Sequence, residues 1–288
     1  MSKRLLLLPL LALALAACGS SSDSSSSSSG SSSSKPAANA CTKAKLDLKN
    51  AGTLTVGTDK PAYPPYFADN DPTNGKGFES AVAYAIADKL GYSADQVEWT
   101  VEPFNASYAP GPKDFDFDVN QISITPKRAE QVDFSAPYYT ANQAIVALKD
   151  SDLASATSLS DFSDANIGVQ IGTTSLDAVN AEIQPSTQPR VFQNSNDVVS
   201  ALKNGQVDAV VVDLPTALYL TAVQVPTGTV VGQFESTGDE DQWGALLQKG
   251  SSLTACVSAA IDALQQSGEL PKIEKQWMSN AADAPIIQ

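Results

Sequence analysis

Histidine is absent from all 288 residues of the sequence. Its absence rules out Ser-His-Asp and Cys-His catalysis and histidine-ligated metal sites. Cationic residues are also scarce. The sequence has 18 lysines and arginines but 32 aspartates and glutamates, which gives a formal net charge of −14. Nucleic-acid binding needs basic patches to meet the phosphates, so this balance argues against such a partner. We expect no catalytic residues, no cofactor and no metal.

The apolar run at the N-terminus is too short to cross a membrane. It extends from Leu5 to Ala14 behind the basic pair Lys3 and Arg4, whereas a spanning helix needs about 20 residues. These are the proportions of a signal peptide, here residues 1–17. The ending Leu-Ala-Ala-Cys resembles a bacterial lipobox, which implies cleavage before Cys18 and lipidation of its thiol. The alternative is an ordinary signal peptide with an incidental cysteine.

A low-complexity segment follows, over residues 18–40. Residues 19–34 are almost entirely serine, a composition that cannot bury a core and behaves as a flexible coil. Such a segment has an end-to-end reach of roughly 25 Å. We expect a tether that holds a folded domain clear of a membrane.

Cysteine is rare, with three residues in the whole chain. If Cys18 carries a lipid, Cys41 and Cys256 remain, and an even pair in an oxidising compartment predicts a disulfide. The alternative is two buried free thiols.

About 245 residues remain for the fold, and they alternate between strand and helix patterns. Such alternation predicts an α/β fold with parallel strands, in which ligands bind beyond the carboxyl ends of the strands. We found no internal repeat. The expected strands are 53–57, 97–101, 117–124, 144–148, 167–170, 190–192, 207–212 and 243–247, and the expected helices are 77–90, one from 126 capped by Thr125, one from 175, 196–204, 214–223, 252–266 and 270–278.

Polar and aromatic residues gather where these strands lead into helices. Together they offer a guanidinium, hydroxyls, an isolated carboxylate and aromatic faces. This set complements an α-amino acid zwitterion, because a carboxylate prefers a bidentate arginine and an ammonium prefers a desolvated acid.

Six stretches stand out along the chain: LTVGTD with YPPYF, GFESAVAYAIADKLG, DFDVNQISITPKRAEQVDFSAPYY, IGVQIGTTS, NGQVDAVVVD and LQQSGELPKIEKQW. In this order, over about residues 50–279, they resemble one known family, the type II periplasmic solute-binding proteins of the amino-acid class (family 3), which serve ABC importers. The serine-rich lipoprotein start also resembles that of Gram-positive members.

The resemblance implies a role for seven of the ten candidate ligand-binding residues. It assigns the ligand carboxylate to Arg128, with Ser123 beside it and with Thr173 and Thr174 approaching from a second lobe. It assigns the ammonium to Asp213, an aromatic lid to Tyr63 and an acid near the ligand side chain to Asp59. Phe67, Phe104 and Gln121 are further candidates for lining the site.

Each assignment has a structural alternative. Arg128 could be a solvated helix residue, and Asp213 could cap the helix that follows it. Thr173 and Thr174 could likewise be caps alone. Tyr63 and Phe67 could be core aromatics, and Asp59 could simply form a turn.

The chain also departs from the family pattern. Ala81 stands where an acid is usual, although Glu79 is kept. Asn120 and Gln121 replace small residues, and we expect them to narrow the pocket and to influence selectivity. Residues 104–114 contain two prolines and a glycine in place of a regular helix, and Phe104 and Tyr108 are candidates for lining the cleft.

The resemblance implies a two-lobe, Venus-flytrap fold with two hinge crossings. We expect lobe 1 at 45–142 plus 240–288, and lobe 2 at 143–239. The crossings would lie near 139–143 and 235–242. The ligand would bridge the lobes and favour closure.

The predicted function is a monomeric substrate-binding lipoprotein on the extracytoplasmic face of the cell membrane. It would bind a free polar L-amino acid, with glutamine placed ahead of lysine, arginine and glutamate, and deliver it to an ABC permease. The alternatives are an enzyme of the same fold, such as a cyclohexadienyl or arogenate dehydratase, and a ligand-sensing module.

Overall fold

The computed structural model describes residues 41–236, 240–278 and 284–288. The expected signal peptide, Cys18 and the tether lie outside these residues. Across the described ranges, no helix combines the length and apolar character needed to cross a membrane.

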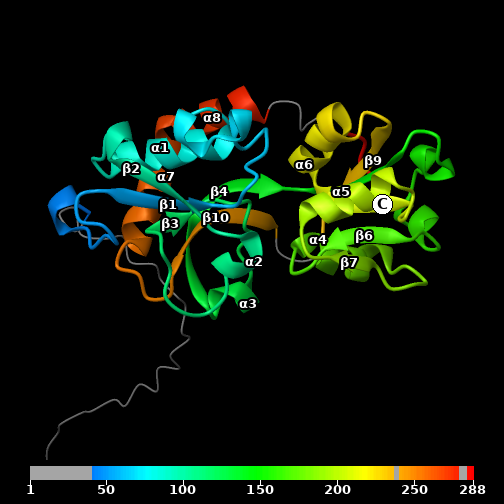
Figure 1. Cartoon of the computed structure of the whole chain (residues 1–288), viewed down its shortest axis with the longest axis horizontal. Helices are drawn as coiled ribbons and strands as arrows, with labels where there is room; N and C mark the ends of the chain where they lie inside the picture. The colour runs from blue at the N-terminus through cyan, green and yellow to red at the C-terminus, as the bar shows by residue number, and fades with distance from the viewer. Residues whose placement is uncertain (1–40, 237–239, 279–283) are drawn as a thin grey trace, which may run out of the picture. The chain divides into compact units, whose positions relative to one another are not determined.

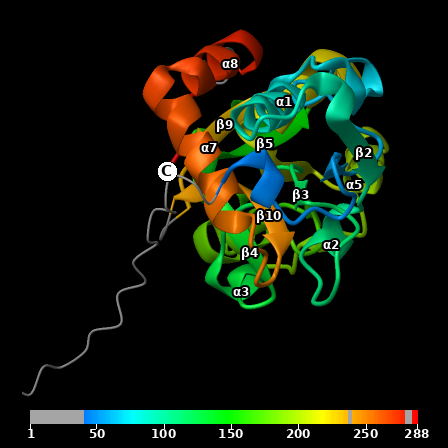
Figure 2. The ribbon, with the colours of Figure 1, turned by 90° about the vertical axis from the view of Figure 1, so that its left-hand side faces the viewer.

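The first of two five-stranded sheets has the strand order β2-β1-β3-β10-β4. β1 is parallel to β2 and β3, whereas β10 is antiparallel to β3 and β4. The helices α1 (Phe78–Lys89), α7 (Thr254–Ser267) and α8 (Glu269–Trp277) pack together beside this sheet (Figures 1 and 2). Its strands are β1 (Leu54–Thr58), β2 (Val97–Val101), β3 (Phe117–Asp118), β4 (Val132–Ala141) and β10 (Asp241–Gln248).

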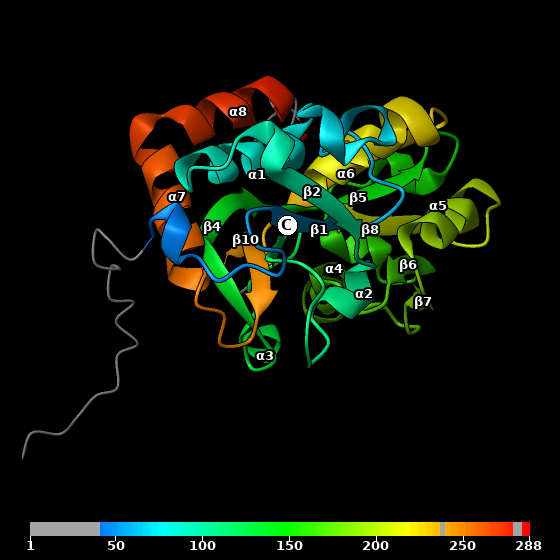
Figure 3. The same ribbon diagram turned by 60° about the vertical axis from the view of Figure 1, so that its left-hand side comes forward.

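The second sheet has the order β7-β6-β8-β5-β9. Its parallel strands are β6, β7 and β8, while β5 is antiparallel to both β8 and β9. α5 (Ser195–Lys203) and α6 (Leu214–Tyr219) pack on it (Figure 3). The strands are β5 (Gln143–Leu148), β6 (Ile167–Gln170), β7 (Arg190–Phe192), β8 (Ala209–Asp213) and β9 (Gly228–Phe234), and α4 spans Thr174–Ala178.

The apolar patterns of the sequence account for the two cores. All five residues of β1 are buried, because strands flank it on both sides and helices cover it. α1 buries Phe78, Val82 and Ile86, which are spaced four residues apart on one helix face. The second sheet carries apolar clusters of its own, which include Ile145 and Val211 in one and Val146 and Val210 in the other. We call the two sheets with their helices the first and second lobes.

Some expected elements have different lengths in the structure. The strand expected over 117–124 ends at Asp118, because Gln121 adopts a positive φ of 49° that bends the chain out of the sheet. Ser123 keeps a single bridge to Trp243. The helix expected over 214–223 is α-helical to Tyr219 and continues as a π-helix over Leu220–Gln224.

Two further short helices lie close to this bend. α3 (Pro126–Ala129) begins as predicted, with the Thr125 hydroxyl accepting a hydrogen bond from the Arg128 amide at 3.2 Å. α2 (Phe104–Ser107) is a single turn of helix at the start of the irregular segment 104–114.

A disulfide joins Cys41 to Cys256, with a separation of 215 residues along the chain. Cys256 lies in α7, and both cysteines pack against the core of the first lobe. The bond therefore fixes the start of the described chain to a helix near its end, within one lobe.

The chain passes between the two sheets three times. It leaves the first sheet after Ala141 and enters the second at Gln143, and it returns between Phe234 and Asp241. The last residues differ from the expected assignment to lobe 1, because Ile287 is buried in an apolar cluster of the second lobe. Gln233 accepts from the Ile287 amide at 2.9 Å and donates to the Pro285 carbonyl at 2.7 Å, which adds a third passage to the two expected.

Candidate functional site

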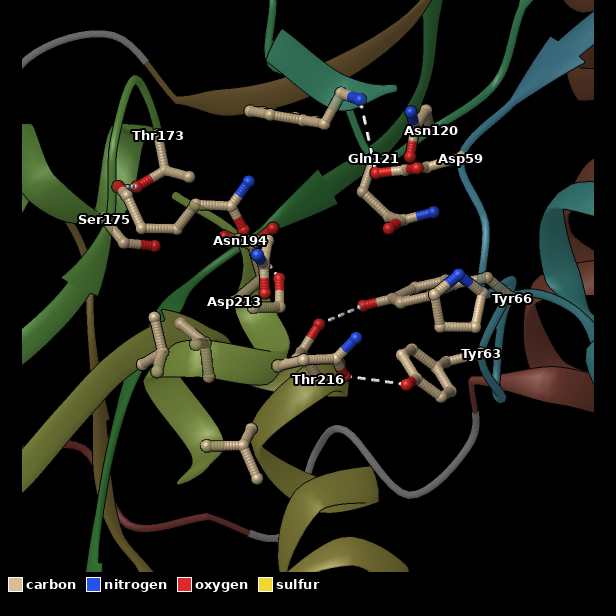
Figure 4. Close-up of a pocket in the computed structure, with 18 of the residues that line it drawn as sticks. Asp59, Tyr63, Tyr66, Asn120, Gln121, Thr173, Ser175, Asn194, Asp213 and Thr216 are labelled. Atoms are coloured by element: carbon tan, nitrogen blue, oxygen red, sulfur yellow. Dashed lines mark hydrogen bonds between the residues drawn. The ribbon is translucent and has the colours of Figure 1, made fainter. Parts of the chain in front are cut away.

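A cavity of about 610 Å³ lies between residues of both lobes. It opens beyond the carboxyl ends of β1, β6 and β8, where ligands bind in sheets of this kind. Figure 4 shows side chains from the two lobes pointing into it. All ten predicted ligand-binding residues line the cavity: Asp59, Tyr63, Phe67, Phe104, Gln121, Ser123, Arg128, Thr173, Thr174 and Asp213.

Arg128 is buried rather than solvated, with 7% of its surface exposed. Its guanidinium lies over the rings of Phe104 and Tyr108, at 5.5 and 4.9 Å from the ring centroids. Nη1 donates to the Ser123 carbonyl at 2.7 Å, and Nη2 donates to the Gly172 carbonyl of the second lobe at 2.8 Å. A guanidinium has five N–H donors, so these two bonds leave capacity for an anion.

Burial lowers the pKa of Arg128 from its ordinary value, but the charge remains because arginine starts from a very high pKa. Gly172 makes the contact between lobes possible. Its φ is +73°, and a Cβ there would collide with the Tyr108 hydroxyl. A fixed, desolvated cation therefore stands at the junction of the lobes.

The second-lobe turn that faces Arg128 contributes hydroxyl groups. Thr173 caps α4, because its Oγ1 accepts from the Leu176 amide and donates to the Gln170 carbonyl. Thr174 differs, since its Oγ1 donates to Asp241 at 2.8 Å and lies 3.2 Å from the Ser123 hydroxyl. Thr173 is thus a cap that also lines the cavity, whereas Thr174 contacts the first lobe directly.

Asp213 ends β8 and precedes α6, but its side chain makes no capping hydrogen bond. Its Oδ1 instead accepts from Gln143 Nε2 at 2.7 Å. Burial and the neighbouring Asp241 raise the pKa of Asp213 to about 8. A desolvated carboxyl of this kind favours a cationic partner, since an ammonium would restore its charged form.

Two tyrosines of the first lobe reach across to the second. The Tyr63 hydroxyl donates to Asn196 at 2.7 Å, and the Tyr63 ring lies 5.8 Å from the ring of Tyr219. The Tyr66 hydroxyl lies 2.8 Å from the Thr216 hydroxyl, and Figure 4 shows the two facing each other. The lobes therefore contact each other on this side of the cavity as well as at Arg128.

Asp59 lines the cavity and accepts hydrogen bonds from two backbone amides. Its Oδ1 accepts from the Lys60 amide at 2.6 Å, and its Oδ2 accepts from the Phe104 amide at 3.2 Å. Asn120 lies close by (Figure 4), and its Nδ2 donates to the Glu102 carbonyl at 3.4 Å.

Gln121 is held from behind by Glu79. The Glu79 carboxylate accepts from both the backbone amide and the side-chain amide of Gln121, and from the Tyr138 hydroxyl. Glu79 is fully buried, and burial raises its pKa to about 7. The side-chain nitrogen of Gln121 is therefore engaged by Glu79, while Gln121 still lines the cavity.

The aromatic candidates divide into two groups. Phe67 is almost completely buried and packs edge-on against Trp99, so its main role is in the core. Phe104 lines the cavity and flanks Arg128. Tyr108 covers the guanidinium but is not a lining residue.

Several residues that line the cavity were not predicted from the sequence. Asn194 caps α5 by accepting from the Asp197 amide, and Asn194 and Asn196 both line the cavity. An Asn-Ser-Asn-Asp run at a strand-to-helix junction was the available signal. The contacts of Thr216, and of Asp241 beside the cavity, could not be predicted from the sequence, because they form between the two lobes.

The site thus places a buried cation and a partly buried acid on opposite lobes, with a cavity between them. Two α/β lobes of mixed five-stranded sheets around such a cavity define the solute-binding fold of the periplasmic type II class.

Comparisons with known proteins give the same class as the fold does. Residues 54–280 match the model of the bacterial extracellular solute-binding proteins, family 3, and the chain belongs to that family. The arginine-binding extracellular protein ArtP of Bacillus subtilis is 31% identical over 232 residues, which are 78% of this chain and 86% of ArtP. The L-cystine-binding protein TcyJ of Escherichia coli K12 is 29% identical over 232 residues, 80% and 84% of the two chains.

Solved structures show the same fold. One, described as an ancestral arginine-binding protein bound to glutamine, is 34% identical with a TM-score of 0.66, and the match covers 78% of this chain and 97% of that one. These relatives are amino-acid-binding proteins by name.

Proposed function

We propose that this chain is the substrate-binding component of an ABC importer for a polar L-amino acid. One observation carries the proposal: Arg128 and Asp213 lie on opposite lobes and line one cavity. An α-carboxylate at Arg128 and an α-ammonium at Asp213 would pair each buried charge with its opposite. Ser123, Thr173 and Thr174 surround the carboxylate position in this arrangement.

Ligand binding would favour the contact between lobes. Both charged groups of the ligand are satisfied at once only when the lobes are together, so an amino acid shifts the protein toward that state. The bonds from Tyr63 to Asn196 and from Tyr66 to Thr216 stabilise the same state. The resulting form would dock on a membrane permease.

Glutamine is the side chain that we propose first. The cavity wall is rich in amides, which can exchange hydrogen bonds with a carboxamide. Those amides belong to Asn120, Gln170, Gln193, Asn194, Asn196 and Gln224.

Arginine is the second candidate, because Asp59 adds a carboxylate to the wall. Relatives of similar identity are named for arginine, cystine and glutamine. The variant Asp59→Asn separates the candidates, since it should weaken arginine binding far more than glutamine binding.

We further propose that the protein is anchored through a lipid on Cys18 at the extracytoplasmic face of the membrane. Replacing Cys18 by serine should move the protein from the membrane fraction to the soluble fraction. Membrane retention of that variant would contradict the anchor without affecting the ligand assignment.

A thermal-shift screen of the twenty L-amino acids tests the ligand assignment, followed by calorimetry on those that raise the melting temperature. We expect one or a few polar amino acids to bind saturably and to be recovered unchanged. Asp213→Asn should abolish that binding in a folded protein. If none of the twenty binds, the proposed function is wrong.

A further inference from the structure

Two carboxyl groups meet at one amide beside the cavity. Gln143 Nε2 donates to Asp213 Oδ1 at 2.7 Å and to Asp241 Oδ2 at 2.9 Å. Because one nitrogen serves both bonds, the two oxygens are at most about 5.6 Å apart, within the range where like charges oppose each other's ionisation. Asp213 belongs to β8 of the second lobe and Asp241 to β10 of the first.

Asp241 has few partners that could offset its charge. Its Oδ2 accepts from Gln143 and from the Thr174 hydroxyl. Its Oδ1 is buried and makes no hydrogen bond to any described residue. A buried carboxylate oxygen without a donor is costly when it is charged, so this position favours an incoming cation.

The surrounding elements do not supply the missing charge. Arg128 of α3 is the nearby cation, but its terminal nitrogens donate to the Ser123 and Gly172 carbonyls and not to either carboxylate. Glu79 of α1 adds a further buried acid, and the phenols of Tyr66 and Tyr139 also face Asp213. The site without ligand therefore holds more acidic groups than cations.

We propose that Asp241 is a positioning residue of the ammonium site, and that its nearby carboxyl group helps Asp213 to hold a proton which the bound ligand displaces. The inference rests on the proposed function. When the α-ammonium approaches, the carboxyl O–H bond breaks, the proton leaves to the solvent, and an ammonium N–H donates to the freed carboxylate. Asp241 acts through Asp213 and through Gln143 rather than through its own contact with the ligand.

The displaced proton makes the affinity depend on pH. The ligand-bound state holds one proton fewer, so binding tightens as pH rises toward the pKa of the free site. The limiting slope is about tenfold per pH unit. The pKa of Asp213, near 8, places that window around neutrality.

Calorimetry in two buffers of different ionisation enthalpy counts the released protons. The probe is whichever of the twenty L-amino acids gives the largest thermal shift, titrated at pH 6, 7 and 8. We expect about one proton released per ligand near pH 7 in the unaltered protein. Asp241→Asn keeps an acceptor for Thr174 and Gln143 but removes the second charge. Because burial of Asp213 remains, this variant should release measurably fewer protons near pH 7 and show a shallower pH profile, with the midpoint shifted to lower pH.

Asp177→Asn is the matched control. Asp177 is an exposed acid of α4 that also contributes charge near Arg128, and its replacement should leave the proton count unchanged. Binding without proton release in the unaltered protein overturns this inference alone, as does an unchanged count in Asp241→Asn. Failure of all twenty amino acids to bind overturns the proposed function and this inference together.

Discussion

Replacing Arg128 by methionine removes the guanidinium but leaves an unbranched side chain to fill the space between Phe104 and Tyr108. Leaving the partner of a buried ion pair without its counterion costs about 3–5 kcal/mol. At 1.4 kcal/mol per tenfold change, the dissociation constant of the ligand should rise between about a hundredfold and a few thousandfold. The loss should be common to all amino acids that bind, because the carboxylate is common to all of them.

The fold should survive the change, because the variant loses two hydrogen bonds from a charged donor and no core packing. Each such bond contributes about 1.5–3 kcal/mol to stability, so thermal denaturation should show a lower midpoint but a cooperative transition. Calorimetry on that folded protein measures the affinity. Lys127→Met is the control, since Lys127 is the exposed neighbour of Arg128. A folded Arg128→Met protein that binds within about threefold of the unaltered one would refute the carboxylate assignment.

Three further changes test other parts of the structure. Replacing Cys41 and Cys256 by serine should lower the free energy of unfolding in guanidinium by about 2–5 kcal/mol and leave affinity unchanged, because the bond lies within one lobe; a large loss of affinity would contradict that separation. Burial raises the folded-state pKa of Glu79 to about 7 from an ordinary 4.5, so this group stabilises the fold most below pH 4.5 and loses the effect as pH rises through 7. In Glu79→Gln the decline in unfolding free energy between those pH values should be smaller by up to about 3 kcal/mol, and an identical profile would place the titration elsewhere. Tyr63→Phe removes one hydrogen bond between the lobes and should weaken ligand binding about two- to tenfold, with no effect on the unfolding midpoint of the free protein beyond a degree or two.

The sequence predicted those parts of the fold whose pattern is local. Buried strands such as Val210 and its neighbours are continuous apolar runs, and the cap at Thr125 is a single side chain next to proline. The position of Arg128 at a cavity followed from its strand-to-helix junction. Its burial could not be predicted, because Phe104 and Tyr108 cover it from a segment without periodicity.

Contacts between distant segments account for the other differences. The hydrogen bonds from Gln121 to Glu79 could not be predicted from the sequence. They depend on a positive φ at Gln121 and join residues 42 positions apart. The final Pro-Ile-Ile-Gln is too short to show a period, yet it adds to the second sheet through Gln233. The proximity of Asp241 to Asp213 could not be predicted either, because it depends on their shared contact with Gln143.

The interrupted first lobe has a consequence for the order in which the molecule assembles. The second sheet is drawn from one continuous stretch, Gln143 to Phe234, so it can form as soon as that stretch has emerged. The first sheet must wait for β10, which lies between β3 and β4 in the sheet but begins 100 residues after β4 ends. Until then β4 lacks its neighbouring strand and α1 lacks its contacts with α7 and α8, so the half-made first lobe exposes apolar surface to aggregation and to chaperones.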